Sequence, residues 1–168
     1  MRKSRKETDT LVASPPKNLD ELVKLNSSLG YLFKEAHAAY TTALRRKLKL
    51  HGITLAQWYF LRELWQHEGL TQRQLSRRMK ISEPTTAAAL RLMERRGLVC
   101  RKQSKHDRRG MHIFLTEKGR SLRDSVLARV LMVNSEASRG LSKDTIRNIQ
   151  VGVRRILDNL VGQEKDDV

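Results

Sequence analysis

The chain lacks the features that would point to secretion, a membrane or disulfide chemistry. Its 168 residues include one cysteine, Cys100, so no disulfide can form within the chain, and a reducing cytoplasm fits it best. No apolar run approaches the ~18 residues that a membrane span needs. The N-terminal stretch is basic and has no apolar centre of the kind found in a signal peptide. We therefore expect a soluble, cytoplasmic protein without membrane contact.

Motifs of catalysis and of metal binding are also missing from the sequence. There is no glycine-rich phosphate loop, no nucleophile elbow, no His-Glu zinc motif and no isolated pair of acids. The five histidines form no ligand pair at helix or strand spacing, which argues against a metal sensor. We expect Cys100 to be buried and inert. The chain is predicted not to be an enzyme and to need no cofactor.

Acidic residues are scarce relative to basic ones. The chain has 34 Lys and Arg against 18 Asp and Glu, a formal net charge of +16 and a pI near 10.7. Such an excess predicts a polyanionic partner, namely DNA, RNA or an anionic membrane surface. More than half of the excess falls between residues 71 and 112, where twelve basic residues stand against three acids. The partner is therefore expected to bind this segment.

The first third of the chain predicts a tail and two helices. Residues 1–18 are polar and basic, which is typical of a flexible arm that either contacts a phosphate backbone or stays solvated. Apolar residues at three- and four-residue steps predict a long helix over 19–50, and a second helix over 54–67. A long amphipathic helix in a small protein often packs on a second copy of the chain.

Residues 70–99, LTQRQLSRRMKISEPTTAAALRLMERRGLV, predict two helices that follow each other directly. Thr71 and Gln74 form a Thr-x-x-Gln capping box, which marks the start of a short helix. Ser82 is the predicted N-cap of the next helix, and Gly97 is its predicted left-handed stop. A short helix, a tight turn and a second helix make a helix-turn-helix, with Leu75, Met79, Ile81, Leu90, Leu92 and Met93 expected to fill the angle between the helices.

The next segment predicts a β-hairpin. LVCRK at 98–102 and MHIFLT at 111–116 are typical of strands, and KHDRRG at 105–110 joins them. A hairpin at this place after a helix-turn-helix is a wing. Thr116 and Ser142 are the predicted caps of two further helices, and the last of these has one apolar stripe.

The predicted fold is mainly α with a small β-hairpin wing. It combines a winged helix-turn-helix domain with a helical dimerisation domain. We assign residues 1–18 to the arm, 54–116 to the winged helix-turn-helix DNA-binding domain, and 19–53 with 117–163 to the helical dimerisation region.

The residue types at the second helix and at the wing suit double-stranded DNA. The small side chains of SEPTTAAAL allow the helix to enter the major groove, where Thr85 and Thr86 can contact base edges; the alternative is that the alanines reflect helix propensity alone. Arg109 at the wing tip can enter the minor groove with Asp107 holding its guanidinium. The competing interpretation of the tip is a solvated turn with a local ion pair.

Residues 70–119 resemble the multiple-antibiotic-resistance regulator (MarR) family of winged helix-turn-helix transcription factors. The run LMERRGLV, the D-R-R of the wing and the strand ending in LTEKG carry this resemblance, which extends over about 25–160. It implies a homodimer on a near-palindromic operator, formed by the first and last helices. The expected DNA-binding residues are Gln72, Ser82, Thr85, Thr86, Arg91, Arg95, Lys105, Asp107, Arg108 and Arg109. The expected dimer interface is Leu22, Leu29, Ile146, Ile149, Val153, Ile156, Leu157 and Leu160.

The resemblance also implies a small-molecule effector, because many members release DNA on binding an aromatic acid, a phenol or its CoA thioester. Aromatic side chains with a His or Arg would suit an aromatic carboxylate, although two Trp seven residues apart more often belong to a plain core. The expected ligand-binding residues are His37, Tyr40, Leu44, Trp58, Arg62 and Trp65.

The predicted function is a ligand-responsive, sequence-specific transcriptional regulator, with a repressor favoured over an activator. The alternative is a sequence-neutral architectural nucleic-acid-binding protein, which the high charge also suits. Against it stand the capped recognition helix and the lack of aromatic platforms for single-stranded RNA. The effector, the operator, the regulated genes and any contact between the arm and DNA are left open by the sequence.

Overall fold

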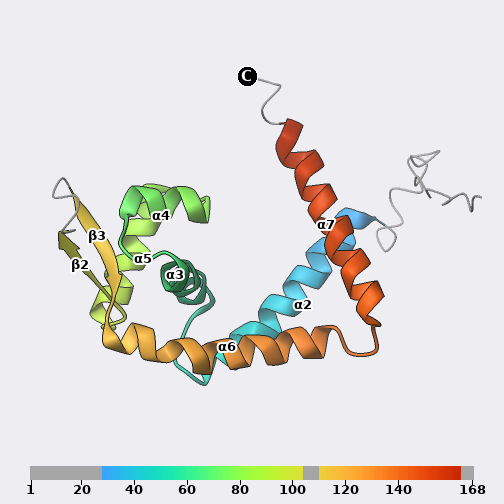
Figure 1. The fold of residues 1–168 in the computed structure, drawn as a ribbon, viewed down its shortest axis with the longest axis horizontal. Coiled ribbons are helices and arrows are strands. Elements are labelled where there is room, and N and C mark those ends of the chain that lie inside the picture. Colours follow the sequence, from blue (N-terminus) through green and yellow to red (C-terminus); the bar gives the residue numbers. More distant parts are fainter. Residues whose placement is uncertain (1–27, 104–109, 164–168) are drawn as a thin grey trace, which may run out of the picture. The chain divides into compact units, whose positions relative to one another are not determined.

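The computed structural model of the protein describes residues 28–103 and 110–163 (Figure 1). The chain divides into two compact units, residues 1–39 and 40–168, and helix α2, Leu29–Lys49, runs across the division. The predicted start of this helix near residue 19, the basic arm and the interface residue Leu22 lie outside the described residues. The packing set out below belongs to the second unit.

The second unit is mainly helical with a small antiparallel sheet, as the sequence predicts. Strand β1 adds a short edge to the predicted hairpin, so the sheet has the order β1-β3-β2, with Leu70 opposite Ile113 and Thr71 opposite His112. The elements after α2 are α3 (Leu55–Gln66), β1 (Leu70–Thr71), α4 (Gln72–Met79), α5 (Glu83–Arg95), β2 (Val99–Gln103), β3 (Met111–Leu115), α6 (Glu117–Ala137) and α7 (Lys143–Gln163).

The helices begin where the sequence places their caps. The Thr71–Gln74 capping box is present, and Ser82 accepts a hydrogen bond from the amide of Thr85. Thr116 and Ser142 cap α6 and α7 in the same way. The helix starts are therefore determined locally, by side chains that satisfy the first free amides.

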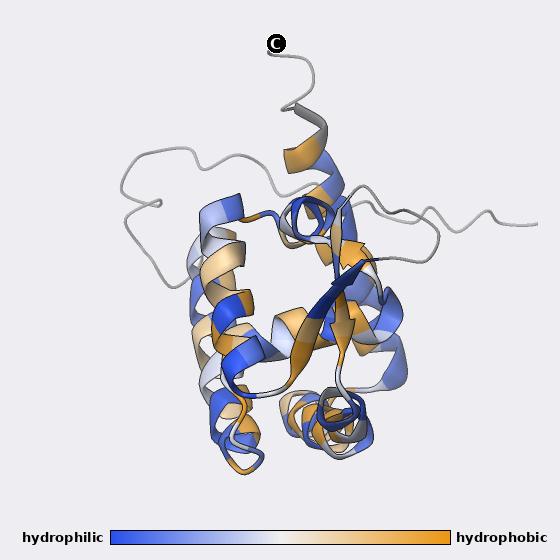
Figure 2. Cartoon of the chain, turned by 90° about the vertical axis from the view of Figure 1, so that its left-hand side faces the viewer, coloured by the Kyte–Doolittle hydropathy of each residue, from blue (hydrophilic) through white to orange (hydrophobic). Residues whose placement is uncertain are grey.

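One apolar core joins α2, α3, the helix-turn-helix, the sheet and α6. Leu44, Leu61, Leu75, Leu90 and Val126 are among its fully buried members. Figure 1 shows α4 beside α5, with the sheet next to α5 and with α6 passing α3, in line with the contacts among these elements. In Figure 2 the inner strand β3 is largely apolar, whereas the end of β2 is strongly hydrophilic. The core thus holds the two helices of the helix-turn-helix at a defined angle.

Leu92 is an exception among the residues expected to fill that angle. Its side chain is 51% exposed, whereas Leu90 and Met93 are fully buried. Leu92 lies two residues after Leu90, which is about 200° around a helix, so the two side chains lie on opposite faces. The prediction that Leu92 packs inside is therefore wrong.

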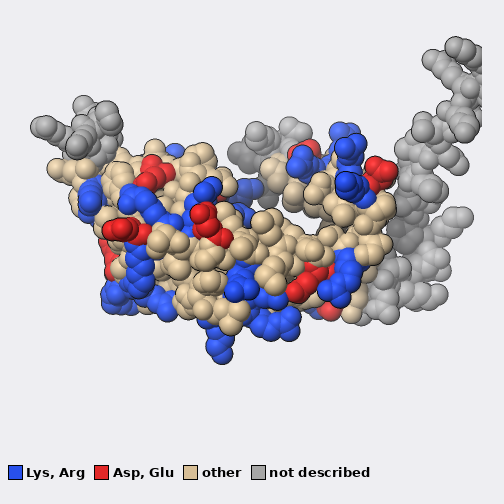
Figure 3. Space-filling view, turned by 60° about the horizontal axis from the view of Figure 1, so that its bottom comes forward, with Lys and Arg blue, Asp and Glu red and all other residues tan. Residues whose placement is uncertain are grey.

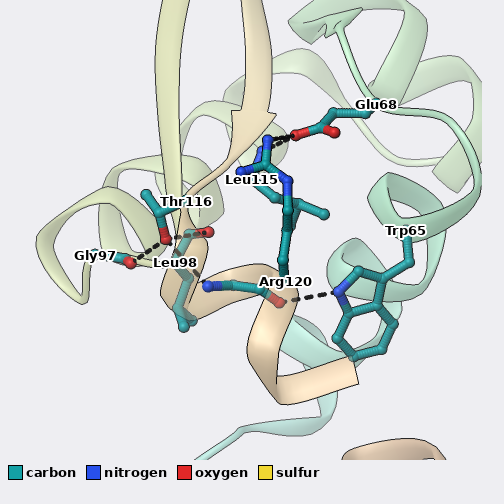
Figure 4. A network of polar contacts seen from close by, with 8 residues as sticks. Trp65, Glu68, Gly97, Leu98, Leu115, Thr116 and Arg120 are labelled. Carbon is teal, nitrogen blue, oxygen red and sulfur yellow. Dashed lines mark hydrogen bonds and ion pairs between the residues drawn. The ribbon is translucent and has the colours of Figure 1, made fainter. Parts of the chain in front are cut away.

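A network of hydrogen bonds at the start of α6 connects the wing to α3 and the loop that follows it (Figure 4). The carboxylate of Glu68 accepts hydrogen bonds from the amide of Leu115, at 2.8 Å, and from Arg120, at 2.6 Å. The indole of Trp65 donates to the carbonyl of Gly119 at 3.0 Å. The hydroxyl of Thr116 lies within hydrogen-bonding distance of the carbonyls of Gly97 and Leu98. These bonds connect α3, the turn after α5, and β3 at one place.

Among the described residues, no helix is both long enough and apolar enough to cross a membrane.

Candidate nucleic-acid interface

Helix α5 has one face in the core and another in solvent. Thr86, Leu90 and Met93 follow each other at helical spacing and are buried. Ser82 and Thr85, at the start of the helix, are exposed. Pro84 stands in the first turn, where a missing amide proton costs nothing. The exposed N-terminal turn therefore presents two hydroxyls to a partner, at the helix end that carries partial positive charge, as a helix that enters a major groove does.

The exposed face continues along the helix. Ala88 and Leu92 lie three and seven residues after Thr85 and are exposed, as are Arg91 and Arg95. Sequence reasoning did not single out Ala88 and Leu92 as surface residues of this helix. The spacing of Thr85, Ala88 and Leu92 is the signal that could have found them, since it keeps all three on one face.

Thr86 is not available to a base edge, and we correct its assignment. Its side chain is 0% exposed, and its hydroxyl donates to the carbonyl of Ser82 at 3.1 Å. The hydroxyl of buried Ser76 in α4 lies 2.9 Å from the same oxygen atom of Thr86 and can donate to it. The position of Thr86 on the Leu90–Met93 stripe explains its burial. This pair of hydroxyls joins α4 to α5 inside the helix-turn-helix instead.

Helix α4 begins close to α5. Gln72 is its first residue and is half-buried, and its carbonyl accepts a hydrogen bond from Ser76. The guanidinium of Arg73 lies 3.8 Å from the carboxylate of Glu83, the first residue of α5. This ion pair is exposed and contributes little stability. Its consequence is positional, because it links the N-terminal turns of the two helices that are expected to face DNA.

Many of the basic side chains in this region have no acidic partner. Arg78 pairs with Glu63 at 3.0 Å, and Arg101 pairs with Glu94 at 3.2 Å. Figure 3 shows a different face, the bottom of Figure 1 along α6, on which Lys and Arg are also more widespread than Asp and Glu. An unpaired cation keeps its full charge for a phosphate. Within residues 71–103, those in no ion pair with another described residue are Arg77, Lys80, Arg91, Arg95, Arg96 and Lys102.

The wing is held to α5 at its base. Strands β2 and β3 pair from Val99–Leu115 to Gln103–Met111, and the Arg101–Glu94 ion pair connects β2 to α5. Cys100 is half-buried rather than buried, because its strand lies at the edge of the sheet. The expected wing-tip residues Lys105, Asp107, Arg108 and Arg109 lie outside the described residues.

Two of the six expected ligand-binding residues belong to the core. Leu44 is 1% and Trp58 is 4% exposed, and both pack within the main apolar cluster. A ligand could reach them only by displacing that cluster, so we correct both assignments. Trp65 lies with its ring centre 6.0 Å from that of Trp58, and its indole N–H is already bonded to Gly119. The two tryptophans therefore pack as part of the apolar core, which is the alternative that their spacing also allows.

Tyr40 and Arg62 are more accessible. The hydroxyl of Tyr40 donates to Oδ1 of Asn134 in α6 at 2.7 Å. Burial, and then the neighbouring Tyr59, raise the pKa of Tyr40, so the hydroxyl is protonated at neutral pH. Arg62 lies over the ring of Tyr59 at 5.6 Å. The sixth residue, His37, is exposed and belongs to the other unit of the chain.

The C-terminal helix α7 carries apolar side chains that the described residues 28–103 and 110–163 leave exposed. Ile149, Leu157 and Leu160 are half or more exposed, while Ile146, Val153 and Ile156 are half-buried. Figure 2 shows apolar residues along this helix. Leu29 at the start of α2 is 61% exposed. Exposed apolar side chains at helical spacing over several turns are typical of a protein–protein contact.

The part of the chain that the structure describes holds no group of three or more His, Cys, Asp or Glu side chains placed to bind a metal ion.

Comparison with known proteins identifies the family. The family model described as the MarR family matches residues 51–110. The organic hydroperoxide resistance transcriptional regulator of Bacillus subtilis (strain 168) is 31% identical over 105 residues, which cover 62% of this chain and 71% of that protein. The chain belongs to the MarR family of transcriptional regulators.

Other relatives agree with this assignment. The HTH-type transcriptional regulator TtmR of Methylorubrum extorquens (strain PA1) is 34% identical over 104 residues, which are 62% of this chain. The match spans 53% of that protein, about half its length. The homoprotocatechuate degradative operon repressor of Escherichia coli is 32% identical over 58% of this chain and 66% of its own. These relatives are regulators and not enzymes, as the sequence predicts.

The fold is that of MarR regulators of known structure. The crystal structure of CouR from Rhodococcus jostii RHA1 bound to p-coumaroyl-CoA has a TM-score of 0.70 and 26% identity, and the match covers 79% of this chain and 93% of CouR. The winged helix-turn-helix predicted from the sequence is thereby confirmed as the fold of this MarR-family chain.

Proposed function

We propose that this MarR-family protein binds a palindromic operator as a homodimer and represses transcription until an effector releases it. The observation that carries the proposal is the first turn of α5. Ser82 and Thr85 are exposed there, at the capped N-terminus of a helix that packs against α4. Family membership and the unpaired cations within residues 71–103 support the same interpretation.

In the proposed complex, the N-terminal turn of α5 lies in the major groove. Thr85 contacts base edges, and the N-terminus of α5 with the side chain of Ser82 binds a phosphate. Gln72, at the start of α4, contacts the phosphate backbone of the DNA beside the groove. Arg91 and Arg95 neutralise phosphates further along the groove, which supplies affinity that does not depend on sequence.

The assembly in this proposal is a dimer through α7 and the start of α2. The exposed apolar residues of α7 support it, because a monomer would leave Ile149, Leu157 and Leu160 in water. A two-fold dimer presents two copies of α5 and therefore reads two half-sites in opposite orientation.

The effector in this proposal is an aromatic acid, a phenol or an aromatic CoA thioester. Two relatives support the class: one bears the name of a homoprotocatechuate operon repressor, and CouR binds p-coumaroyl-CoA. Within the second unit of this chain, Tyr40 and Arg62 are the accessible polar members of the expected pocket, one a hydroxyl and the other a cation. Both groups suit a carboxylate or a phenolate.

The proposal is tested by fluorescence anisotropy on the DNA upstream of the protein's own gene. A scrambled duplex of equal length and composition is the control, at ~0.15 M salt. We expect a preference of about 10³-fold or more for the natural duplex, which is typical of specific regulators. Aromatic acids and their CoA thioesters are then expected to lower that affinity.

Equal affinity for the two duplexes is followed by a genome-wide binding map. Discrete binding sites elsewhere in the genome would keep the regulator and move its operator. Uniform coverage would contradict sequence-specific regulation and favour the sequence-neutral binder.

A further inference from the structure

A second cationic site lies at the junction of α2, α3 and α5, away from the first turn of α5. A hollow of about 390 Å³ opens there between the end of α2, the start of α3 and the end of α5. Its walls contain no acidic side chain. They are formed by Arg45, Lys49, Gly52, Ile53, Thr54, Leu55 and Arg96.

The three cations of this hollow come from two helix ends. Arg45 and Lys49 are four residues apart in the last turns of α2, so they lie on one face of the helix. Arg96 is the C-cap of α5. None of the three forms an ion pair with a carboxylate anywhere in the described part of the chain. Three like charges that gather without an acid repel each other, and an anion would relieve that repulsion.

The position of Arg96 is set by hydrogen bonds. Its guanidinium donates to Oε1 of Gln57 at 2.8 Å. The same oxygen accepts the amide of Thr54, while Thr54 accepts the amide of Gln57, so Arg96 is tied to the capping box of α3. A guanidinium that is already held in place loses less entropy when it binds a ligand.

The backbone adds a further positive element. Thr54 and Leu55 line the hollow and form the first turn of α3, whose amide end carries partial positive charge. Gly52 has φ +65°, and a Cβ there would lie 3.7 Å from the Arg96 guanidinium. A side chain at residue 52 would therefore be strained by its backbone conformation, while its Cβ would only touch the guanidinium at an ordinary contact distance.

The floor of the hollow is apolar. Ile53 is buried and Leu55 is half-buried, so both show hydrocarbon rather than polar atoms to the space. A cationic rim over an apolar floor fits an anionic group attached to an apolar body. The anion then contacts the cations, and the apolar body contacts the floor. A fully hydrated inorganic ion would leave the floor unused.

The hollow is separate from the surface that we propose for DNA. Helix α5 has 13 residues, so Arg96 lies about 20 Å from the first turn of the helix at 1.5 Å per residue. None of the residues Tyr40, Arg62 and Trp65 lines it. Its cations are therefore placed neither at the groove-facing turn nor at the expected effector pocket.

We propose that this hollow binds a small organic anion, a phosphate or carboxylate on an apolar group, through Arg45, Lys49 and Arg96. An anion at this place touches the end of α2, the start of α3 and the end of α5 together. It stabilises the junction between the long N-terminal helix and the helix-turn-helix.

The test is a titration of the full-length protein with phenyl phosphate, without DNA and at constant ionic strength. Amide resonances in a ¹H–¹⁵N spectrum report the site. We expect saturable shifts at Gly52, Ile53 and Leu55, and none with phenol, which has the same ring without the charge. Inorganic phosphate is expected to bind more weakly than phenyl phosphate, because it cannot use the floor.

Variants distinguish this site from general attraction to a basic protein. Arg96→Gln is expected to weaken phenyl phosphate binding by about tenfold, which is the loss of one charged hydrogen bond. Lys49→Gln is the second variant, since the Lys49 side chain bonds to no other described residue and cannot disturb the cap of α3. Arg139→Gln removes the same charge outside the hollow and is expected to bind as the parent does. Equal weakening in all three variants, or shifts that map elsewhere, would overturn the proposal.

A second experiment, which measures DNA affinity, tests whether the cations of the hollow bind the DNA backbone instead of a small anion. If Lys49→Gln and Arg96→Gln lower DNA affinity while phenyl phosphate fails to bind the parent protein, the cations serve the DNA backbone and the small-anion site is refuted. Phenyl phosphate binding with unchanged DNA affinity supports it. The phenyl phosphate titration contains no operator, so its outcome does not depend on whether the protein is a repressor.

Discussion

Two adjacent threonines near the start of α5 have opposite environments. Thr85 is exposed beside Ser82, whereas Thr86 is buried and hydrogen-bonded to the carbonyl of Ser82 and to Ser76. Since a helix turns by about 100° per residue, one of the two neighbours can face a groove while the other faces the core. The same residue type therefore serves recognition at one position and architecture at the next.

This difference predicts opposite mutational effects. Thr85→Ala removes an exposed hydroxyl, so we expect DNA affinity to fall by about 1 kcal/mol and the free energy of unfolding to stay within about 0.5 kcal/mol. Thr86→Val keeps the shape but removes the hydroxyl that bonds to Ser82 and Ser76. Because Ser76 keeps its bond to the carbonyl of Gln72, the variant should cost about 1 kcal/mol of stability. Urea unfolding and anisotropy measure the two quantities. The assignment fails if Thr86→Val is neutral in unfolding.

A second residue-scale prediction concerns glycine. A Cβ at Gly119 would overlap the carbonyl oxygen of Leu98, so Gly119→Ala is expected to destabilise the protein by about 2–3 kcal/mol. Gly152 in α7 is the matched control, because nothing lies within 4 Å of its added Cβ. Gly152→Ala should be neutral or stabilising by up to about 1 kcal/mol, since alanine favours a helix. Thermal unfolding distinguishes the two variants, and equal melting temperatures would contradict the close packing at residue 119.

At the scale of elements, single polar contacts connect helices that are far apart in sequence. Lys47 in α2 lies 2.9 Å from Glu136 in α6, and Tyr40 in α2 bonds to Asn134 in α6. Glu68 connects the end of α3 to β3 and α6. Sequence periodicity indicates which face of each helix is apolar, but these cross-links depend on which helix becomes the neighbour.

The Lys47–Glu136 pair makes part of the stability dependent on pH. The hydrogen bond from Lys47, and then its charge, lower the pKa of Glu136 from the ordinary value of 4.5. A lowered carboxyl pKa contributes stability that is present above 4.5 and is lost as the pH falls through the folded-state pKa. We expect Glu136→Gln to lower the melting temperature at pH 7, by less at high salt.

The same comparison at low pH is the control. Well below the folded-state pKa of Glu136, the parent and Glu136→Gln are expected to melt together, because the carboxyl is then neutral in both states. A difference that persists unchanged at low pH would assign the effect to packing and not to the ion pair.

At the scale of the whole molecule, the described part of the single chain leaves large apolar side chains exposed to solvent. Leu157 is 55% and Leu160 is 63% exposed on α7, and Leu131 and Leu141 add further apolar surface in α6 and the loop after it. Burying such side chains contributes about 1.5–3 kcal/mol each. A second copy that covers α7 would account for this exposure, in agreement with the proposed homodimer.

The dimer is tested by charge on this stripe. The double variant Leu157→Glu and Leu160→Glu is expected to be a monomer by light scattering after size exclusion, because each new carboxylate would be buried without a partner. Asn159→Glu introduces a charge next to the stripe and is expected to stay dimeric. A dimer that survives the double substitution would place the interface elsewhere.

Elements whose causes are local could be predicted from the amino-acid sequence. Thr71 with Gln74, Ser82, Thr116 and Ser142 start helices through side chains that satisfy neighbouring amides, so the helix-turn-helix and the hairpin could be predicted within about one residue. The net charge and its concentration around these elements indicate a nucleic-acid partner from composition alone, because charge does not depend on how the chain folds.

The availability of side chains, in contrast, depends on tertiary packing. Thr86, Leu44 and Trp58 are of types that suit a site, yet packing places them in the core, while Leu92 is apolar and exposed. The short strand β1 and the anion hollow at Arg96 also depend on segments that meet from distant parts of the chain. Burial is a property of the neighbours that a residue acquires on folding, so local pattern could not supply it.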